Sequence, residues 1–80
     1  MSETKIYDAE NFEEAFVAST LKDVIEILED RGYNPINQIV GYLMSGDPGY
    51  ISNHKEARNR LTKIDRDKLL KILIKNFIEN

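Results

Sequence analysis

The single histidine, His54, is the first residue to consider for chemistry, because imidazole serves both as a metal ligand and as a general base. A zinc or iron site takes three or four ligands from His, Cys and carboxylate side chains. The sequence has no cysteine, and Glu56 is the only carboxylate at ligand spacing from His54. We therefore expect neither a metal site nor a cofactor, and we interpret His54 as a surface residue near a helix start.

Hydroxyl and carboxylate side chains are the other candidates for catalysis: Ser45, Ser52, Thr62, Asp65 and Asp67. A nucleophilic hydroxyl needs a base held against it and a third group that orients the base, and one histidine without a partner does not supply both. Asp65 and Asp67 are two residues apart, so on a helix they point away from each other. A place near the positive end of a helix dipole explains them more simply. The sequence thus predicts a protein without enzymatic activity.

Basic residues between positions 55 and 68 offer a different chemistry, namely the binding of negative charge: Lys55, Arg58, Arg60, Lys63, Arg66 and Lys68. One interpretation is a small helical nucleic-acid-binding repressor, because Arg and Asn side chains read base edges. Acidic residues interrupt this basic run, however, and the chain is acidic overall. We therefore favour a docking surface for an acidic or phosphorylated partner, including the chain's own N-terminal segment, and take Lys55, Arg58, Arg60 and Lys63 as its candidates.

Size and charge limit the architecture. Eighty residues make a single domain that buries only about 60–65% of its unfolded surface, so oligomerisation is one expected source of stability. The net charge of −3 divides into −6 over residues 1–40 and +3 over residues 41–80. Two halves of opposite net charge can attract each other within one subunit or between two subunits. The sequence shows neither a membrane-spanning run nor a signal peptide, so we expect a cytoplasmic protein that does not insert into a membrane.

The segment 32–51 contains both prolines and all four glycines of the chain. Asn34 is a good N-cap and Pro35 fits the first helical position, so they predict a helix over 35–45 that Gly46 ends in the left-handed conformation. Asp47 and Pro48 repeat the same device and open a tight turn that carries Tyr50 and Ile51. We expect the apolar residues of the 35–45 helix to form one buried face: Ile36, Ile39, Val40, Leu43 and Met44. Two polar neighbours have no role in this face and are candidates for a core or partner contact: Asn37 and Gln38.

The remaining pattern predicts an all-α domain over residues 10–80 after a flexible tail over residues 1–9. Apolar residues from Phe12 to Leu28 recur at helical spacing, which indicates a helix of about five turns that Gly32 ends. Asn53 and Glu56 resemble a capping box for a helix over about 54–62. Asp65 is the expected cap of a final helix that reaches about Ile78. The fold class is therefore a compact bundle of four or five short helices.

The final helix has more apolar surface than one core needs. Seven apolar residues occupy an arc of about 240° when they are placed at 100° per residue: Leu69, Leu70, Ile72, Leu73, Ile74, Phe77 and Ile78. One interpretation is a central helix that the other three surround. We favour the other, a homodimer in which a second copy covers the surplus face, with Ile74, Phe77 and Ile78 in the interface.

Segment 32–51, which reads G-Y-N-P-I-N-Q-I-V-G-Y-L-M-S-G-D-P-G-Y-I, resembles the IreB family of small cytoplasmic regulators of Gram-positive bacteria. The A-R-N at 57–59 and the R-D at 66–67 extend the resemblance, which covers roughly residues 20–78. This many specified positions are far more selective than a short motif. The resemblance implies a small dimeric helical protein without enzymatic activity. Its implied partners are a membrane Ser/Thr kinase with extracellular PASTA repeats and the opposing phosphatase, in the control of cell-envelope stress.

The resemblance also implies phosphorylation near the N-terminus. Thr4, preceded by Glu3, is similar to the second of two threonines that the family carries as phosphoacceptors, and Ser2 is the looser counterpart of the first. A phosphate adds about −1.5 to −2 charges, which Arg or Lys side chains bind. We therefore expect Thr4, with Ser2 beside it, to be the site of regulation.

Overall fold

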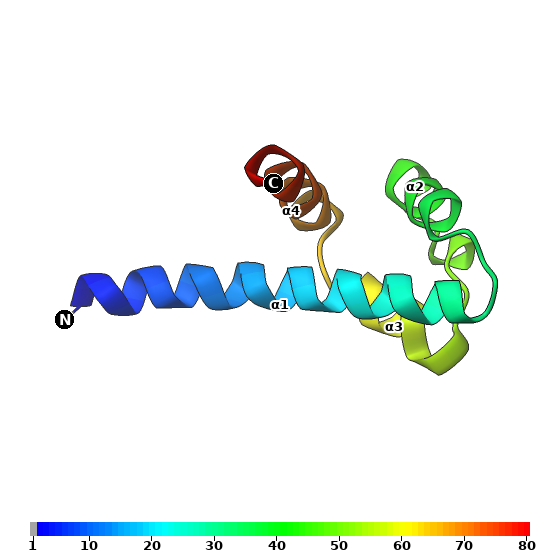
Figure 1. Ribbon diagram of the computed structural model, residues 1–80, viewed down its shortest axis with the longest axis horizontal. Coiled ribbons are helices and arrows are strands. Elements are labelled where there is room, and N and C mark those ends of the chain that lie inside the picture. Colours follow the sequence, from blue (N-terminus) through cyan, green and yellow to red (C-terminus); the bar gives the residue numbers. More distant parts are fainter. Residues whose placement is uncertain (1) are drawn as a thin grey trace.

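Four α-helices and two short 3₁₀ turns make up the computed structural model, which describes the backbone of residues 2–80 and the side chains of residues 11–80. The elements are α1 (Ser2–Asp30), α2 (Pro35–Ser45), η1 (Pro48–Tyr50), η2 (His54–Glu56), α3 (Ala57–Thr62) and α4 (Arg66–Glu79). Helix α1 runs the length of the molecule, with α2 and α4 on one side of it and α3 on the other (Figure 1). Residues 2–80 contain no strand, which confirms the all-α fold class.

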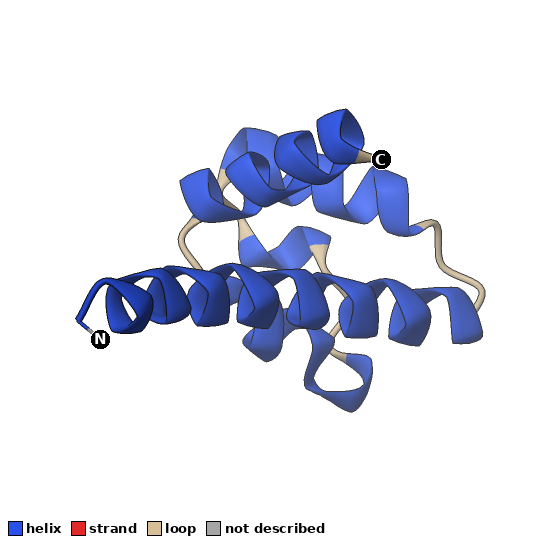
Figure 2. Cartoon of the chain, turned by 60° about the vertical axis from the view of Figure 1, so that its left-hand side comes forward, coloured by secondary structure: helices blue, strands red, loops and turns tan. Residues whose placement is uncertain are grey.

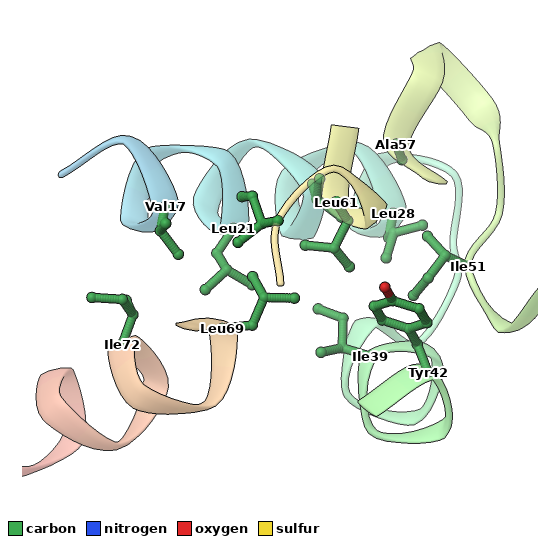
Figure 3. Packing of buried hydrophobic residues seen from close by; sticks show 12 residues of the cluster. Val17, Leu21, Leu28, Ile39, Tyr42, Ile51, Ala57, Leu61, Leu69 and Ile72 are labelled. Atoms are coloured by element: carbon green, nitrogen blue, oxygen red, sulfur yellow. The ribbon is translucent and has the colours of Figure 1, made fainter. Parts of the chain in front are cut away.

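One hydrophobic core joins all four helices (Figure 3). The contribution of α1 is a stripe at helical spacing, Val17, Leu21, Val24 and Leu28. The other elements close over this stripe with Ile39, Tyr42, Ile51, Ala57, Leu61, Ile64, Leu69 and Ile72. The core therefore lies between α1 and the later helices. Figure 2 shows from a second side how these helices lie along α1.

The first helix begins earlier than the sequence analysis expected. The backbone is helical from Ser2, whereas the apolar pattern places the helix start near Phe12. Adding turns to an existing helix is easier than nucleating one, so a helix can continue without an apolar stripe. The N-terminal turns of α1 extend past the other helices (Figure 1). The flexibility of residues 1–9 stays a prediction.

Helix α2 has the predicted ends but a different buried face. The Asn34 side chain accepts a hydrogen bond from the Asn37 backbone N–H at 3.1 Å, Pro35 is the first helical residue, and Gly46 ends the helix at φ +75°. The prediction that Ile36, Val40 and Met44 are buried is wrong, because the structure exposes all three side chains. The core side of α2 instead passes through Ile39 and Tyr42.

The connection before α3 also differs from the sequence pattern. The predicted capping box does not form, because the Asn53 side chain makes no cap hydrogen bond and Glu56 instead accepts from the Asn59 amide at 3.2 Å. Lys55 and Glu56 have left-handed φ values of 50° and 64°, so helical geometry begins only at Ala57. Asp65 precedes α4 as predicted, but its side chain makes no cap hydrogen bond either.

Candidate functional site

The turn after α2 is held by side chains of its own segment. Ser45 Oγ donates to the Gly41 carbonyl at 2.7 Å and accepts from the Asp47 N–H at 3.0 Å. Asp47 Oδ1 accepts from the Gly49 N–H at 2.8 Å, and Pro48 opens the 3₁₀ turn η1. These bonds account for Ser45 and Asp47 as structural residues of the turn.

Two further contacts fasten this turn to α2. The Tyr50 ring lies so close to the backbone of Gly41 that a Cβ atom at position 41 would overlap it. Gln38 Oε1 accepts from the Ser52 N–H at 2.9 Å in a partly buried position. Of the two candidates for a polar contact, Gln38 thus makes one within the chain, whereas the Asn37 side chain is exposed.

The structure does not gather the four basic candidates into one free patch. Arg58 Nε donates to the Ile51 carbonyl at 2.9 Å, and Arg60 forms an ion pair with Asp23 of α1 at 2.7 Å. Lys55 and Lys63 are exposed. Two of the four side chains therefore already hold parts of the fold together, whereas among the described residues the structure gives no such bond to the two exposed lysines.

A mostly apolar hollow lies between α2 and α4. It has a volume of about 540 Å³ and is lined by Ile25 and Glu29 of α1, by Leu73 of α4, and by residues of α2 and its cap: Asn34, Pro35, Ile36, Ile39, Val40 and Leu43. The exposed Ile36 and Val40 form its outer wall, which explains how large apolar side chains of α2 come to lie outside the core.

Helix α4 carries a second exposed apolar surface, which we call the α4 ridge and define as Leu70, Ile74, Phe77 and Ile78. Phe77 is 87% exposed and Ile78 is 73% exposed, whereas Leu69 and Ile72 on the core side are buried. The alternative of a central helix surrounded by the other three is therefore wrong. Because Leu73 lines the hollow, the α4 ridge and the hollow adjoin each other along α4.

Ion pairs join the N-terminal half of α1 to α4. Lys68 Nζ lies 3.2 Å from Glu13 Oε2, and Lys75 Nζ lies 2.8 Å from Glu14 Oε1. The hydrogen bond from Lys75 holds the pKa of the Glu14 carboxyl below its ordinary value, and the bond to Glu13 raises the pKa of Lys68. Beside these pairs, α1 exposes two aromatic side chains one turn apart: Phe12 and Phe16.

Ser2 and Thr4 lie in the first turns of α1, and their side chains fall outside the described residues. Among the described residues, no group of three or more His, Cys, Asp or Glu side chains could hold a metal ion, and His54 is the partly buried first residue of η2. No helix of the described chain is both long enough and apolar enough to span a membrane.

These features define a small helical domain whose exposed surfaces suit binding to other proteins. A protein-family model described as IreB regulatory phosphoprotein matches residues 2–79. The match covers nearly the whole chain, so the chain belongs to the IreB family. It is therefore a regulatory phosphoprotein and not an enzyme, and a phosphoprotein family implies a protein kinase among its partners.

Proposed function

We propose that this protein is a homodimeric regulator that a membrane Ser/Thr kinase of the PASTA type phosphorylates on Thr4, with Ser2 as a second acceptor, in the response to cell-envelope stress. The observation that carries the proposal is the family match over residues 2–79. The kinase, its opposing phosphatase and the cytoplasmic location are those that the family resemblance implies. The position of both acceptors in the first turns of a helix that extends past the globule suits access by a kinase.

The surfaces of α2 and α4 support the proposed dimer. The α4 ridge adjoins the hollow that Ile36 and Val40 wall, so one partner surface can cover both. Monomeric proteins rarely expose a contiguous apolar patch of more than a few hundred Å². A two-fold contact would place the ridge of each copy, including Ile74, Phe77 and Ile78, against the corresponding surface of the other.

The basic set of Lys55, Arg58, Arg60 and Lys63 stays a proposed receptor for the phosphate or for an acidic partner. Arg58 and Arg60 would have to leave the Ile51 carbonyl and Asp23 to take part. Docking on Lys55 and Lys63 alone provides two exposed charges, and exposed ion pairs contribute only about 0–1 kcal/mol each. A changed contact with a partner protein is therefore the better-supported effect of phosphorylation.

Two measurements test the proposal. Incubation with the cytoplasmic domain of a PASTA-type kinase should add phosphate to Thr4, and the Thr4→Val variant should lose most of the incorporation by mass spectrometry. Sedimentation equilibrium at tens of micromolar should give a dimer, and Ile74→Glu should give a folded monomer because Ile74 is exposed in the single chain. A wild-type monomer, or phosphate elsewhere than Ser2 and Thr4, would contradict the respective half of the proposal.

A further inference from the structure

The N-terminal half of α1 combines three properties that neither the core nor the proposed dimer uses. Its first turns extend past the other helices (Figure 1). Residues 2–16 contain five acidic residues and one lysine, a net charge of −4, and the pairing of Glu13 and Glu14 with Lys68 and Lys75 of α4 leaves −2. Phe12 and Phe16 are 77% and 64% exposed, one helical turn apart. Apolar anchors at i and i+4 on an otherwise charged helix are the pattern by which a helix binds into a groove on another protein.

These aromatic residues lie on the side of α1 away from the α2–α4 hollow. At 100° per residue, Phe12 and Phe16 stand about 100–140° around the helix axis from Val17 in one direction, and Ile25 stands about 80° from it in the other. Ile25 lines the α2–α4 hollow, whereas Phe16 lines a separate hollow of about 140 Å³ with Lys63, Ile64 and Asp65. A second copy that covers α2 and α4 therefore leaves Phe12 and Phe16 uncovered.

We propose that residues 2–16 of α1 form a recognition helix whose Phe12 and Phe16 side chains enter a partner surface that is apolar at its centre and rimmed by Lys or Arg. The remaining net charge of −2 selects a basic rim, and the low charge at the centre of a typical interface matches the two aromatic anchors. The inference rests on the proposed function at one point, the phosphorylation of Thr4.

Phosphorylation of Thr4 would then change the affinity of this helix for its partner. Thr4 precedes Phe12 by eight residues, about 12 Å of helix axis, so one groove that holds a helix of this length contacts both positions. A phosphate adds about −1.5 to −2 charges to a segment whose net charge is −2 after its two ion pairs with α4 are counted. We expect phosphorylation to strengthen binding to a basic-rimmed surface about three- to tenfold at low salt, with the gain falling as salt screens the added charge.

The test uses the full chain labelled with ¹⁵N and a synthetic 18-residue amphipathic helical peptide that has a leucine face rimmed by lysines. The expected amide shift changes centre on residues 8–19, and Phe12→Ser weakens binding by at least about tenfold because it removes an apolar anchor. Met44→Ser on α2 is the control, because Met44 is 82% exposed and belongs to neither the α4 ridge nor the α2–α4 hollow, and this variant should bind the peptide as the wild type does. A peptide with the same leucine face and a glutamate rim should not bind.

Four results would overturn the inference. The first two are amide shift changes centred on α2 and α4 and equal binding of the glutamate-rimmed peptide. The third is unchanged peptide binding by Phe12→Ser. The fourth is a monomeric Phe12→Ser variant, because Phe12 would then belong to the dimer contact. Since Phe12 is exposed, the variant should keep its helical circular dichroism. Phosphate incorporation and the dimer mass are measured without the peptide, so failure of the proposed function is distinguishable from failure of this inference.

Discussion

Arg66 of α4 closes the C-terminal end of α2, where its Nη1 donates to the Leu43 carbonyl at 3.1 Å. The last carbonyls of a helix have no partner within the helix and lie at its negative end, so a guanidinium there is favourable on both counts. The same guanidinium lies directly against Gly46. One side chain thus links the start of α4 to the left-handed turn that ends α2.

This link predicts different costs for alanine at two glycines. Gly46 and Gly32 both have left-handed φ values, +75° and +80°, so alanine at either position should cost about 1 kcal/mol in strain. A Cβ at Gly46 would also lie 2.9 Å from Arg66 Cζ, whereas one at Gly32 meets no atom within 4 Å. Urea unfolding should show Gly46→Ala to be the more destabilising. Equal losses would mean that the Arg66 contact adds nothing.

Adjacent polar residues of α2 should respond differently to the same substitution. Gln38→Ala removes the acceptor of the partly buried Ser52 N–H and should lower the free energy of unfolding by about 1–2 kcal/mol. Asn37→Ala removes an exposed side chain and should leave stability within about 0.5 kcal/mol of the wild type. Thermal or urea unfolding of the two variants measures the difference. A neutral Gln38→Ala would show that this hydrogen bond does not stabilise the turn.

The contact between Gly41 and Tyr50 predicts a change of sign in a double-mutant cycle. In the wild type, Gly41→Ala should displace the Tyr50 ring and destabilise by about 1 kcal/mol or more, despite the better helix propensity of alanine. In a Tyr50→Ala background the overlap is gone, and the same substitution should stabilise by up to about 1 kcal/mol. If Gly41→Ala has the same effect in both backgrounds, the two residues are not coupled.

The ion pair between Glu14 and Lys75 predicts the direction of one carboxyl titration. The Lys75 hydrogen bond lowers the Glu14 pKa below its ordinary value of 4.5. Glu14 therefore contributes stability above that value, and the contribution is lost as the pH falls through the lowered pKa. Side-chain ¹³C titration of Lys75→Gln should show the Glu14 pKa moving upward. Lys71→Gln should move it less, because Lys71 acts only through its charge.

The local backbone of α2 was predictable because the Asn34, Pro35 and Gly46 signals act within a few residues. The side of α2 that faces the core was not predictable, because it depends on how α2 packs against α1 and α3. Tyr42 is buried there in place of Ile36, a choice that apolar spacing alone does not reveal. The capping box at Asn53 and Glu56 failed for a related reason. The chain must turn sharply between the buried Ile51 and Ala57, and two left-handed residues make that turn.

The presence of an exposed apolar surface was predictable from the sequence, whereas the partners of individual basic side chains were not. The wide apolar arc of α4 indicated surplus surface, and the exposed ridge agrees with it. The basic run does not reveal that Arg58 and Arg60 have partners within the fold, because Asp23 lies far away in sequence and Ile51 lies in an irregular turn. Phe12 and Phe16 fit the α1 stripe in the sequence. They are exposed because they stand about 100–140° around the helix axis from Val17 of the core stripe, and so point away from the core.

We propose that phosphate on the N-terminal turns regulates partner binding while the helical fold and the proposed dimer stay intact. The most direct test compares ¹H–¹⁵N spectra and sedimentation of the unmodified protein with those of protein phosphorylated on Thr4. We expect a dimer in both states, with amide shift changes limited to the N-terminal half of α1. Loss of helical signals, dissociation of the dimer, or large shifts at Lys55 and Lys63 that indicate docking within the chain would contradict the account.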